Sequence, residues 1–133
     1  MMVLSGMSSL EQMDDNTSFM SETAPLTEEE EAALKECVEI INSDIKIACT
    51  GCSYCTDGCT AQIPIPKYFS LYNADHKEVH KEDWTSPKGY YSHLTDYLPK
   101  ASDCVECGQC ELICPQHLPI ISLLRDVANY FEK

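Results

Sequence analysis

Residues 104–115 read Cys-Val-Glu-Cys-Gly-Gln-Cys-Glu-Leu-Ile-Cys-Pro, and this stretch decides how the chain is interpreted. Its four cysteines follow the spacing C-x2-C-x2-C-x3-C, and the same spacing occurs at residues 49–59. Two quartets result: Cys49, Cys52, Cys55 and Cys59 form the first, and Cys104, Cys107, Cys110 and Cys114 form the second. They account for eight of the nine cysteines, and so many thiols at such short spacing indicate metal ligation.

The spacing resembles that of bacterial ferredoxins. In those proteins three closely spaced thiolates bind one [4Fe–4S] cluster, and the fourth reaches the other cluster. This crossed rule predicts two clusters. Cys49, Cys52, Cys55 and Cys114 would hold one of them, and Cys104, Cys107, Cys110 and Cys59 would hold the other.

Zinc and disulfides are the alternatives for these thiols. Structural zinc usually joins two C-x2-C knuckles that lie further apart, with two ligands from each knuckle. A disulfide framework suits a small secreted domain, but the N-terminus has neither the positive segment nor the long apolar segment of a signal peptide. The spacing therefore favours iron–sulfur clusters, and a zinc-stabilised interaction domain is kept as the alternative.

An internal repeat extends beyond the cysteines. With a constant offset of 55, residues 63–65 (Ile-Pro-Ile) align with residues 118–120 (Leu-Pro-Ile), and Phe69 aligns with Leu124. Each half is predicted to contain a cluster loop, a turn marked by proline and a helix with an apolar stripe. In the second half this stripe consists of Ile120, Leu123, Leu124, Val127 and Phe131.

The segment between the quartets favours a helical fold. Ser86 as N-cap and Pro87 at the first helical position predict a helix that ends before Pro99, and Trp84 is expected to anchor the segment. No strand pattern is evident. The arrangement resembles the α-helical ferredoxin fold. We therefore expect a mostly α-helical dicluster domain at residues 47–133, preceded by an acidic connecting helix at 23–46 and a separate piece at 1–22.

Charge and hydropathy narrow the possible partners and the compartment. The net charge is −13, and residues 1–48 hold eleven of the 22 acidic side chains but only two of the nine basic ones. Such a chain would repel phosphates, so nucleic acid is not an expected partner. No apolar run approaches the length that crosses a bilayer, and nine thiols suit a reducing compartment, so we predict a cytoplasmic location without membrane contact.

The N-terminal residues contain two helix signals. Residues 3–5 (Val-Leu-Ser) read as a short strand, followed by a turn at Gly6 and a helix for which Ser8 and Glu11 have capping-box spacing. Further on, Thr27 and Glu30 predict a second capping box, which opens the acidic helix. A glycine-containing turn before a helix can bind a phosphate, although such turns are common.

The pattern Gly6-x5-Gln12-x2-Asp15-Asn16 resembles the last β-strand and helix of an aldo/keto reductase barrel, except that aspartate replaces the usual glutamate. Segments 47–52, 101–110 and 114–119 resemble the ferredoxin tail fused to certain aldo/keto reductases. The resemblance implies that Gly6, Ser8, Gln12 and Asn16 contact the 2′-phosphate and adenine of NADP(H). It also implies that residues 1–22 are a β/α remnant of the TIM barrel, its last strand and helix, and that the chain is the C-terminal part of an oxidoreductase.

The barrel itself is largely missing, because a (β/α)8 barrel takes about 250 residues. The family's catalytic residues have no counterpart here, so the chain alone is not expected to be catalytic. The expected partners are the barrel, in cis or in trans, and a redox protein. A fragment of an active NADPH-dependent reductase is the second alternative reading.

Four further positions carry expectations. Cys37 is predicted to be a small buried side chain in register with Leu34 and Ile41. His76 and His80 are expected to form a solvated pair rather than a metal site. Thr60 stands where the first motif usually has proline, which leaves the rigidity of that loop open.

Overall fold

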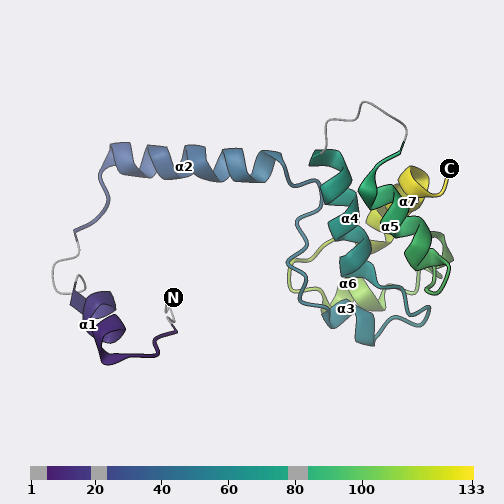
Figure 1. The fold of residues 1–133 in the computed structure, drawn as a ribbon, viewed down its shortest axis with the longest axis horizontal. Coiled ribbons are helices and arrows are strands. Elements are labelled where there is room, and N and C mark those ends of the chain that lie inside the picture. Colours follow the sequence, from purple (N-terminus) through teal and green to yellow (C-terminus); the bar gives the residue numbers. More distant parts are fainter. Residues whose placement is uncertain (1–5, 19–23, 78–83) are drawn as a thin grey trace. The chain divides into compact units, whose positions relative to one another are not determined.

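The computed structural model describes residues 6–18, 24–77 and 84–133, which fold into helices and loops without a β-strand (Figure 1). The mostly α-helical fold class is thus confirmed, whereas the predicted strand at residues 3–5 lies outside the described residues. The helices are α1 (Leu10–Ser18), α2 (Glu28–Ser43), α3 (Tyr54–Asp57), α4 (Ile65–Lys77), α5 (Ser86–Thr95), the 3-10 turn η2 (Ala101–Asp103), α6 (Gln109–Ile113) and α7 (Ile120–Phe131). The chain divides into two compact units, residues 1–38 and 39–133.

Helix α1 begins one residue later than the sequence suggested. The hydroxyl oxygen of Ser9 accepts a hydrogen bond from the backbone N–H of Gln12 at 3.2 Å, and the Gln12 side chain accepts one from the N–H of Ser8 at 2.8 Å. The predicted pairing of Ser8 with Glu11 is therefore wrong, because the hydroxyl of Ser9 caps the helix and the Gln12 side chain takes the N–H of Ser8. No side chain of α1 is buried.

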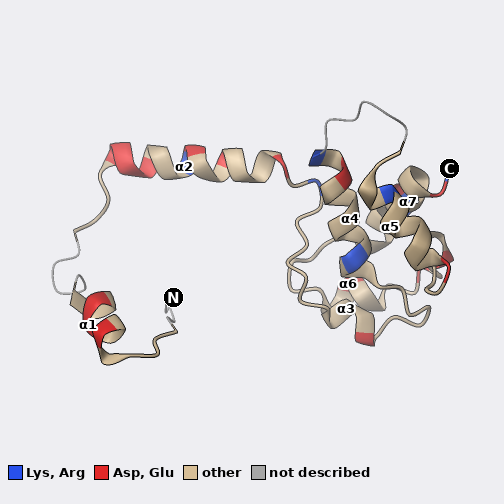
Figure 2. Ribbon diagram, viewed as in Figure 1, with Lys and Arg blue, Asp and Glu red and all other residues tan. Residues whose placement is uncertain are grey.

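Helix α2 begins at the predicted capping box. The N–H of Thr27 donates to the Glu30 carboxylate at 2.8 Å, and the Thr27 hydroxyl oxygen accepts from the Glu30 N–H at 3.3 Å. The bond from Thr27 lowers the pKa of Glu30 below its usual value. Figure 2 shows the acidic residues of α1 and of the first turns of α2 in red. Cys37 is exposed, which corrects the predicted burial, because a single helix cannot bury a stripe and no side chain of α2 is buried.

The backbone of the second unit repeats with the same offset of 55 as the sequence. Helices α3 and α6 begin at residues 54 and 109, and α4 and α7 begin at residues 65 and 120. Left-handed backbone conformations recur in the same register: residues 51 and 106 have φ 71° and 55°, residues 53 and 108 have 66° and 76°, and residues 62 and 117 have 55° and 51°. The two halves therefore share a backbone, and α3 packs on α6 as α4 packs on α7.

The core of this unit lies where α4, α5 and α7 meet (Figure 1). Its largest fully buried apolar side chains are Ile63, Ile65, Tyr68, Phe69, Ile120, Leu124 and Val127. The buried face of α7 confirms the predicted stripe, with Leu123 and Phe131 packed at its margin. Because the stripe of α7 and the first turns of α4 face the same interior, the proline-marked turns bring both cluster loops to one side of this core.

A buried carboxylate connects three helices of the core. Asp75 is fully buried on α4, and it accepts hydrogen bonds from the hydroxyls of Thr85 and Tyr130. Thr85 is the N-cap of α5, where its side chain accepts from the N–H of Lys88, and Tyr130 lies on α7. A buried carboxylate with several hydrogen bonds holds its partners in fixed positions, so Asp75 fixes both α5 and α7 relative to α4.

The start of α5 differs from the prediction in two ways. Thr85 rather than Ser86 is the N-cap, because only the Thr85 hydroxyl also reaches the buried carboxylate of Asp75. Trp84 is 69% exposed, so it does not anchor the segment in the core as expected. Its indole instead lies on the surface of α5, beside Gly89, where an added Cβ would be 3.1 Å from the ring.

A second polar network joins α5 to the residue that follows α7. The hydroxyl of Tyr91 donates to the Glu132 carboxylate at 2.6 Å and accepts from the N–H of Ala101 at 3.0 Å. Glu132 also accepts from the N–H of Ser102 at 3.2 Å. Burial alone would raise the pKa of Glu132, but these hydrogen bonds prevail and lower it. The Tyr91 ring stacks on Phe131 with centroids 4.7 Å apart.

We expect Tyr91→Phe to destabilise the folded protein by about 1–3 kcal/mol, because the buried N–H of Ala101 and the carboxylate of Glu132 lose a partner. Chemical denaturation of the cluster-containing protein under anaerobic conditions measures this difference. Tyr90→Phe is the matched control, since Tyr90 is the adjacent residue and is 64% exposed. The control should change the free energy of unfolding by less than about 0.5 kcal/mol. Equal effects of the two substitutions would contradict the role of the Tyr91 hydroxyl.

Candidate iron–sulfur sites

Two hollows in the second unit are lined by the cysteines of the quartets. The first encloses about 330 Å³ of empty space, counting its open mouth, and the second about 310 Å³. Cys49, Cys52, Cys55 and Cys114 line the first hollow, and Cys59, Cys104, Cys107 and Cys110 line the second. Each hollow thus combines three thiols of one quartet with the last thiol of the other.

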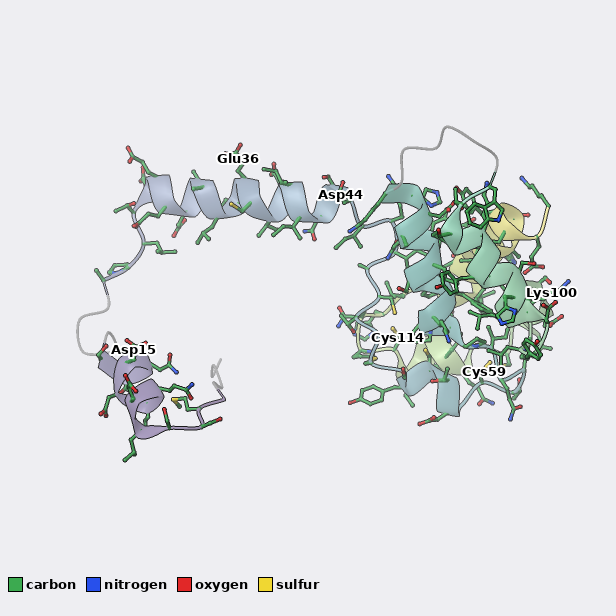
Figure 3. The ribbon with its side chains drawn as sticks, viewed as in Figure 1. Asp15, Glu36, Asp44, Cys59, Lys100 and Cys114 are labelled. Atoms are coloured by element: carbon green, nitrogen blue, oxygen red, sulfur yellow. The ribbon has the colours of Figure 1, made fainter. Side chains whose placement is uncertain are left out.

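Figure 3 labels the two exchanged cysteines, Cys59 and Cys114, at separate points of the second unit. Each follows the short helix that carries the third cysteine of its quartet, α3 with Cys55 and α6 with Cys110. Because α3 and α6 pack against each other, the residue that ends each motif is carried across to the other half. All nine cysteines are present as free thiols.

Left-handed residues turn the backbone around each hollow. Gly51 and Ser53 turn the first loop, and Glu106 and Gly108 turn the second. Glycine takes this conformation without steric cost, whereas a Cβ atom makes it unfavourable. These turns place the second and third cysteines of each motif on the same side of the loop, and the short helices begin directly after them.

The walls of both hollows are apolar apart from the thiols and a few uncharged polar groups. Phe69, Leu118 and Ile120 contribute to the first, and Ile63, Ile121 and Leu124 contribute to the second. Ile65, which is 1% exposed, lines both, so its side chain is part of the wall of each hollow. The cysteines are the only ionisable side chains among the lining residues.

The environment of the thiols divides them into two kinds. Burial raises the pKa of the Cys55 thiol to about 11 and raises that of Cys110 as well. Cys107 is exposed, and hydrogen bonding from the Gln109 backbone and from the Thr60 hydroxyl lowers its pKa. The Thr60 oxygen lies 3.8 Å from the Cys107 sulfur, a contact between the two halves that sequence reasoning missed. The signal for this contact in the sequence was Thr60 itself, which has a hydroxyl at a position where the motif usually has proline.

These features fit an iron–sulfur cluster as the occupant. Four soft thiol ligands in an apolar hollow without competing acids or amines match the donor set that such clusters take. Within residues 6–18, 24–77 and 84–133, no three His, Cys, Asp or Glu side chains come close enough together to hold a single metal ion.

The other residues singled out by the sequence lie elsewhere. Gly6, Ser8, Gln12 and Asn16 belong to the first unit, where Ser8 and Gln12 are engaged in the cap of α1. His76 packs between Tyr72 and Tyr130, with ring centroids 4.1 and 4.6 Å away, and donates to the Tyr72 carbonyl. It is therefore part of an aromatic cluster, while its predicted companion His80 lies outside the described residues.

Among the residues that the structure describes, no helix is both long and apolar enough to cross a membrane. Comparison with curated proteins and with solved structures gave no significant match. Residues 48–118 match the 4Fe-4S dicluster domain family, and this range contains both quartets. Since the matched residues make up more than half of the 133, the protein belongs to the 4Fe-4S dicluster domain family.

Proposed function

We propose that this protein is an electron-transfer module that carries two [4Fe–4S] clusters with crossed ligation. The observation that carries the proposal is the grouping of the eight thiols into two hollows, each with three cysteines of one quartet and the fourth of the other. The family match supports the type of cluster. Cys49, Cys52, Cys55 and Cys114 would hold cluster 1, and Cys104, Cys107, Cys110 and Cys59 would hold cluster 2.

A bound [4Fe–4S] cluster supplies reversible one-electron transfer. The protein's own residues provide its setting. Ile65 forms the wall shared by the two hollows, so the clusters would lie close enough for an electron to pass from one to the other. Apolar side chains such as Phe69 and Leu124 exclude water from the buried thiolates, and the Thr60 hydroxyl can donate to the Cys107 sulfur. Hydrogen bonds to ligand sulfur are one of the factors that set a cluster's potential.

Iron and sulfide analysis tests this proposal directly. We expect about eight irons and about eight sulfides per molecule, with an absorbance shoulder near about 400 nm that dithionite bleaches. A preparation that binds about two zinc ions per molecule, lacks sulfide and does not bleach would instead support the zinc-stabilised interaction domain.

We further propose that the module is the C-terminal part of an aldo/keto reductase-type oxidoreductase. The support is the resemblance of residues 6–16 to the last barrel unit and of the cluster segments to a fused ferredoxin tail. In such a parent protein the barrel, in cis or in trans, would bind NADP(H). Gly6, Ser8, Gln12 and Asn16 would then contact its adenosine end once barrel strands surround them.

It follows that this protein alone should not react with NADPH. Gly6, Ser8, Gln12 and Asn16 provide too few contacts to offset the lost translational and rotational freedom of the nucleotide, so the affinity should be negligible. We expect NADPH to leave the cluster absorbance of the oxidised protein unchanged, while dithionite bleaches the same sample. Rapid bleaching by NADPH, in a preparation free of other reductases, would falsify the view that the protein is only the electron-transfer end.

A further inference from the structure

A third hollow shares Cys49, Thr50 and Pro66 with the first cluster site. Its water-accessible volume is about 390 Å³, which is within the size range of small-molecule sites. The walls come from the first cluster loop and from α4: Cys49, Thr50, Gly51, Pro66, Ser70, Asn73, Ala74 and Lys77. We call it the Cys49 groove.

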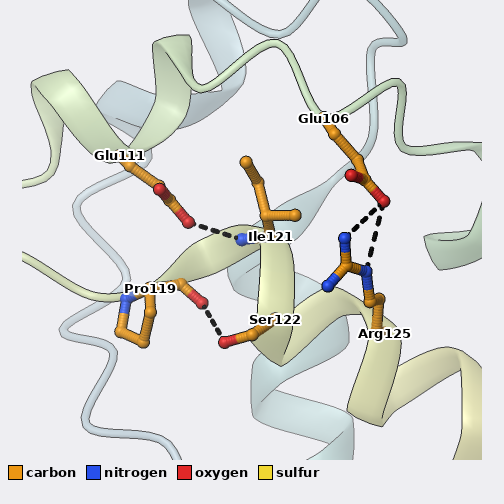
Figure 4. A network of polar contacts seen from close by, with 6 residues as sticks. All are labelled: Glu106, Glu111, Pro119, Ile121, Ser122 and Arg125. Atoms are coloured by element: carbon orange, nitrogen blue, oxygen red, sulfur yellow. Dashed lines mark hydrogen bonds and ion pairs between the residues drawn. The ribbon is translucent and has the colours of Figure 1, made fainter.

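The corresponding place in the second half is occupied by an ion pair. With the offset of 55, Gly51 corresponds to Glu106 and Ser70 corresponds to Arg125. The Arg125 guanidinium contacts the Glu106 carboxylate through Nη2 at 2.7 Å and Nε at 3.2 Å (Figure 4). Glu106 makes this contact from a left-handed backbone conformation, in which a side chain is unfavourable. The two halves thus share a backbone but differ at this place: the first has a hollow lined by Gly51 and Ser70, and the second has the pair of Glu106 and Arg125.

The two halves also differ in the charged residues of their equivalent stretches of sequence. Residues 46–77 contain three basic and two acidic side chains, whereas the equivalent residues 101–132 contain one basic and five acidic. Among the residues that the structure describes, Lys77 is the only charged one that lines the Cys49 groove, and Figure 2 shows the basic residues of α4 in blue. The described lining of the groove therefore carries one positive charge and no negative charge, which favours an anionic group.

We propose that the Cys49 groove binds a small anionic redox molecule of the quinone class, which exchanges electrons with cluster 1. Its ring would lie against Pro66 and Ala74, and its anionic group would reach Lys77. Cluster 2 would then exchange electrons with the quinone by way of cluster 1. This inference rests on the proposed function. In the transfer step each reduced cluster loses one electron, and the quinone takes up these two electrons and two protons from water to become the hydroquinone.

The test uses the intact cluster-containing protein and anthraquinone-2-sulfonate as the probe. Protein reduced with dithionite and freed of excess reductant is mixed with the sulfonate, and stopped-flow absorbance near about 400 nm follows reoxidation of the clusters. Ala74→Trp fills the groove, and its control is Asn129→Trp at the equivalent exposed position of α7. Lys77→Gln removes the charge at the groove, and its control is Lys67→Gln, an exposed lysine of α4 outside the groove.

We expect Ala74→Trp and Lys77→Gln to slow reoxidation about tenfold while both controls stay within about twofold of the parent protein. Titration calorimetry of the oxidised protein with the sulfonate should show binding that the same two variants lose. Reoxidation by uncharged benzoquinone should be slowed by Ala74→Trp but not by Lys77→Gln. Groove variants that match their controls would overturn the groove as the site while leaving the proposed function intact. A preparation without iron, or one that dithionite does not bleach, would refute the proposed function itself.

Discussion

Replacing Cys59 with serine should abolish the cluster held by Cys104, Cys107 and Cys110 and leave the other in place. Cys59 belongs to the first quartet by sequence, but its thiol lines the second hollow. Iron content should fall from about eight to about four per molecule. The electron paramagnetic resonance spectrum of the reduced protein should change from that of two interacting clusters to that of a single one.

Cys114→Ser is the reciprocal test, because the thiol of Cys114 lines the first hollow. It should remove the cluster held by Cys49, Cys52 and Cys55, and the remaining signal should differ from that of the Cys59 variant. Cys37→Ser provides the control, since this exposed thiol belongs to neither hollow. If Cys59→Ser instead removed the cluster held by the rest of its own quartet, ligation would be uncrossed and the assignment would be wrong.

Removal of the metal should unfold most of the protein between residues 49 and 119. The side chains that form the core also form the walls of the two hollows: Ile63, Ile65 and Leu124 are buried on one side by the helices and on the other by the cluster sites. Emptying the hollows therefore exposes part of the core in addition to removing the ligand bonds. Cluster binding is linked to folding in the way known for small metal-dependent domains.

Amide hydrogen exchange on the iron-free protein measures this effect. Amides within residues 49–119 should exchange nearly as fast as in an unfolded polypeptide, while the capped start of α2 retains local protection. Adding iron and sulfide under reducing conditions should restore slow exchange. Slow exchange throughout residues 49–119 in the absence of any metal would mean that the hydrophobic core suffices, and the proposed linkage would be refuted.

The features that the sequence predicted correctly are those that depend on spacing along the polypeptide. The offset of 55 recurs in the helix starts and in the paired left-handed residues. The stripe of α7 and the capping box at Thr27 depend only on neighbouring positions, and both are present.

The errors concern contacts between distant positions. Thr85 replaces Ser86 as the N-cap because of Asp75, which lies on a different helix. Trp84 and Cys37 have apolar side chains, which favoured burial, yet both side chains are exposed in the structure. The Cys49 groove was not predicted either, because it depends on which side chains stand at equivalent positions of the two halves and on the pairing of Glu106 with Arg125.

The hydrogen bond between Asp75 and Tyr130 has a consequence for how the two halves can vary. The two residues are 55 positions apart, so each is the counterpart of the other and the bond joins equivalent positions of the two halves. A protein built from two copies of the first half would bring two buried aspartates together, and one built from two copies of the second half would bring two tyrosines together. Neither duplicate could form the bond present here. The two halves are thus complementary rather than interchangeable at this contact, and substitutions at these two positions should be tolerated only as a matched pair.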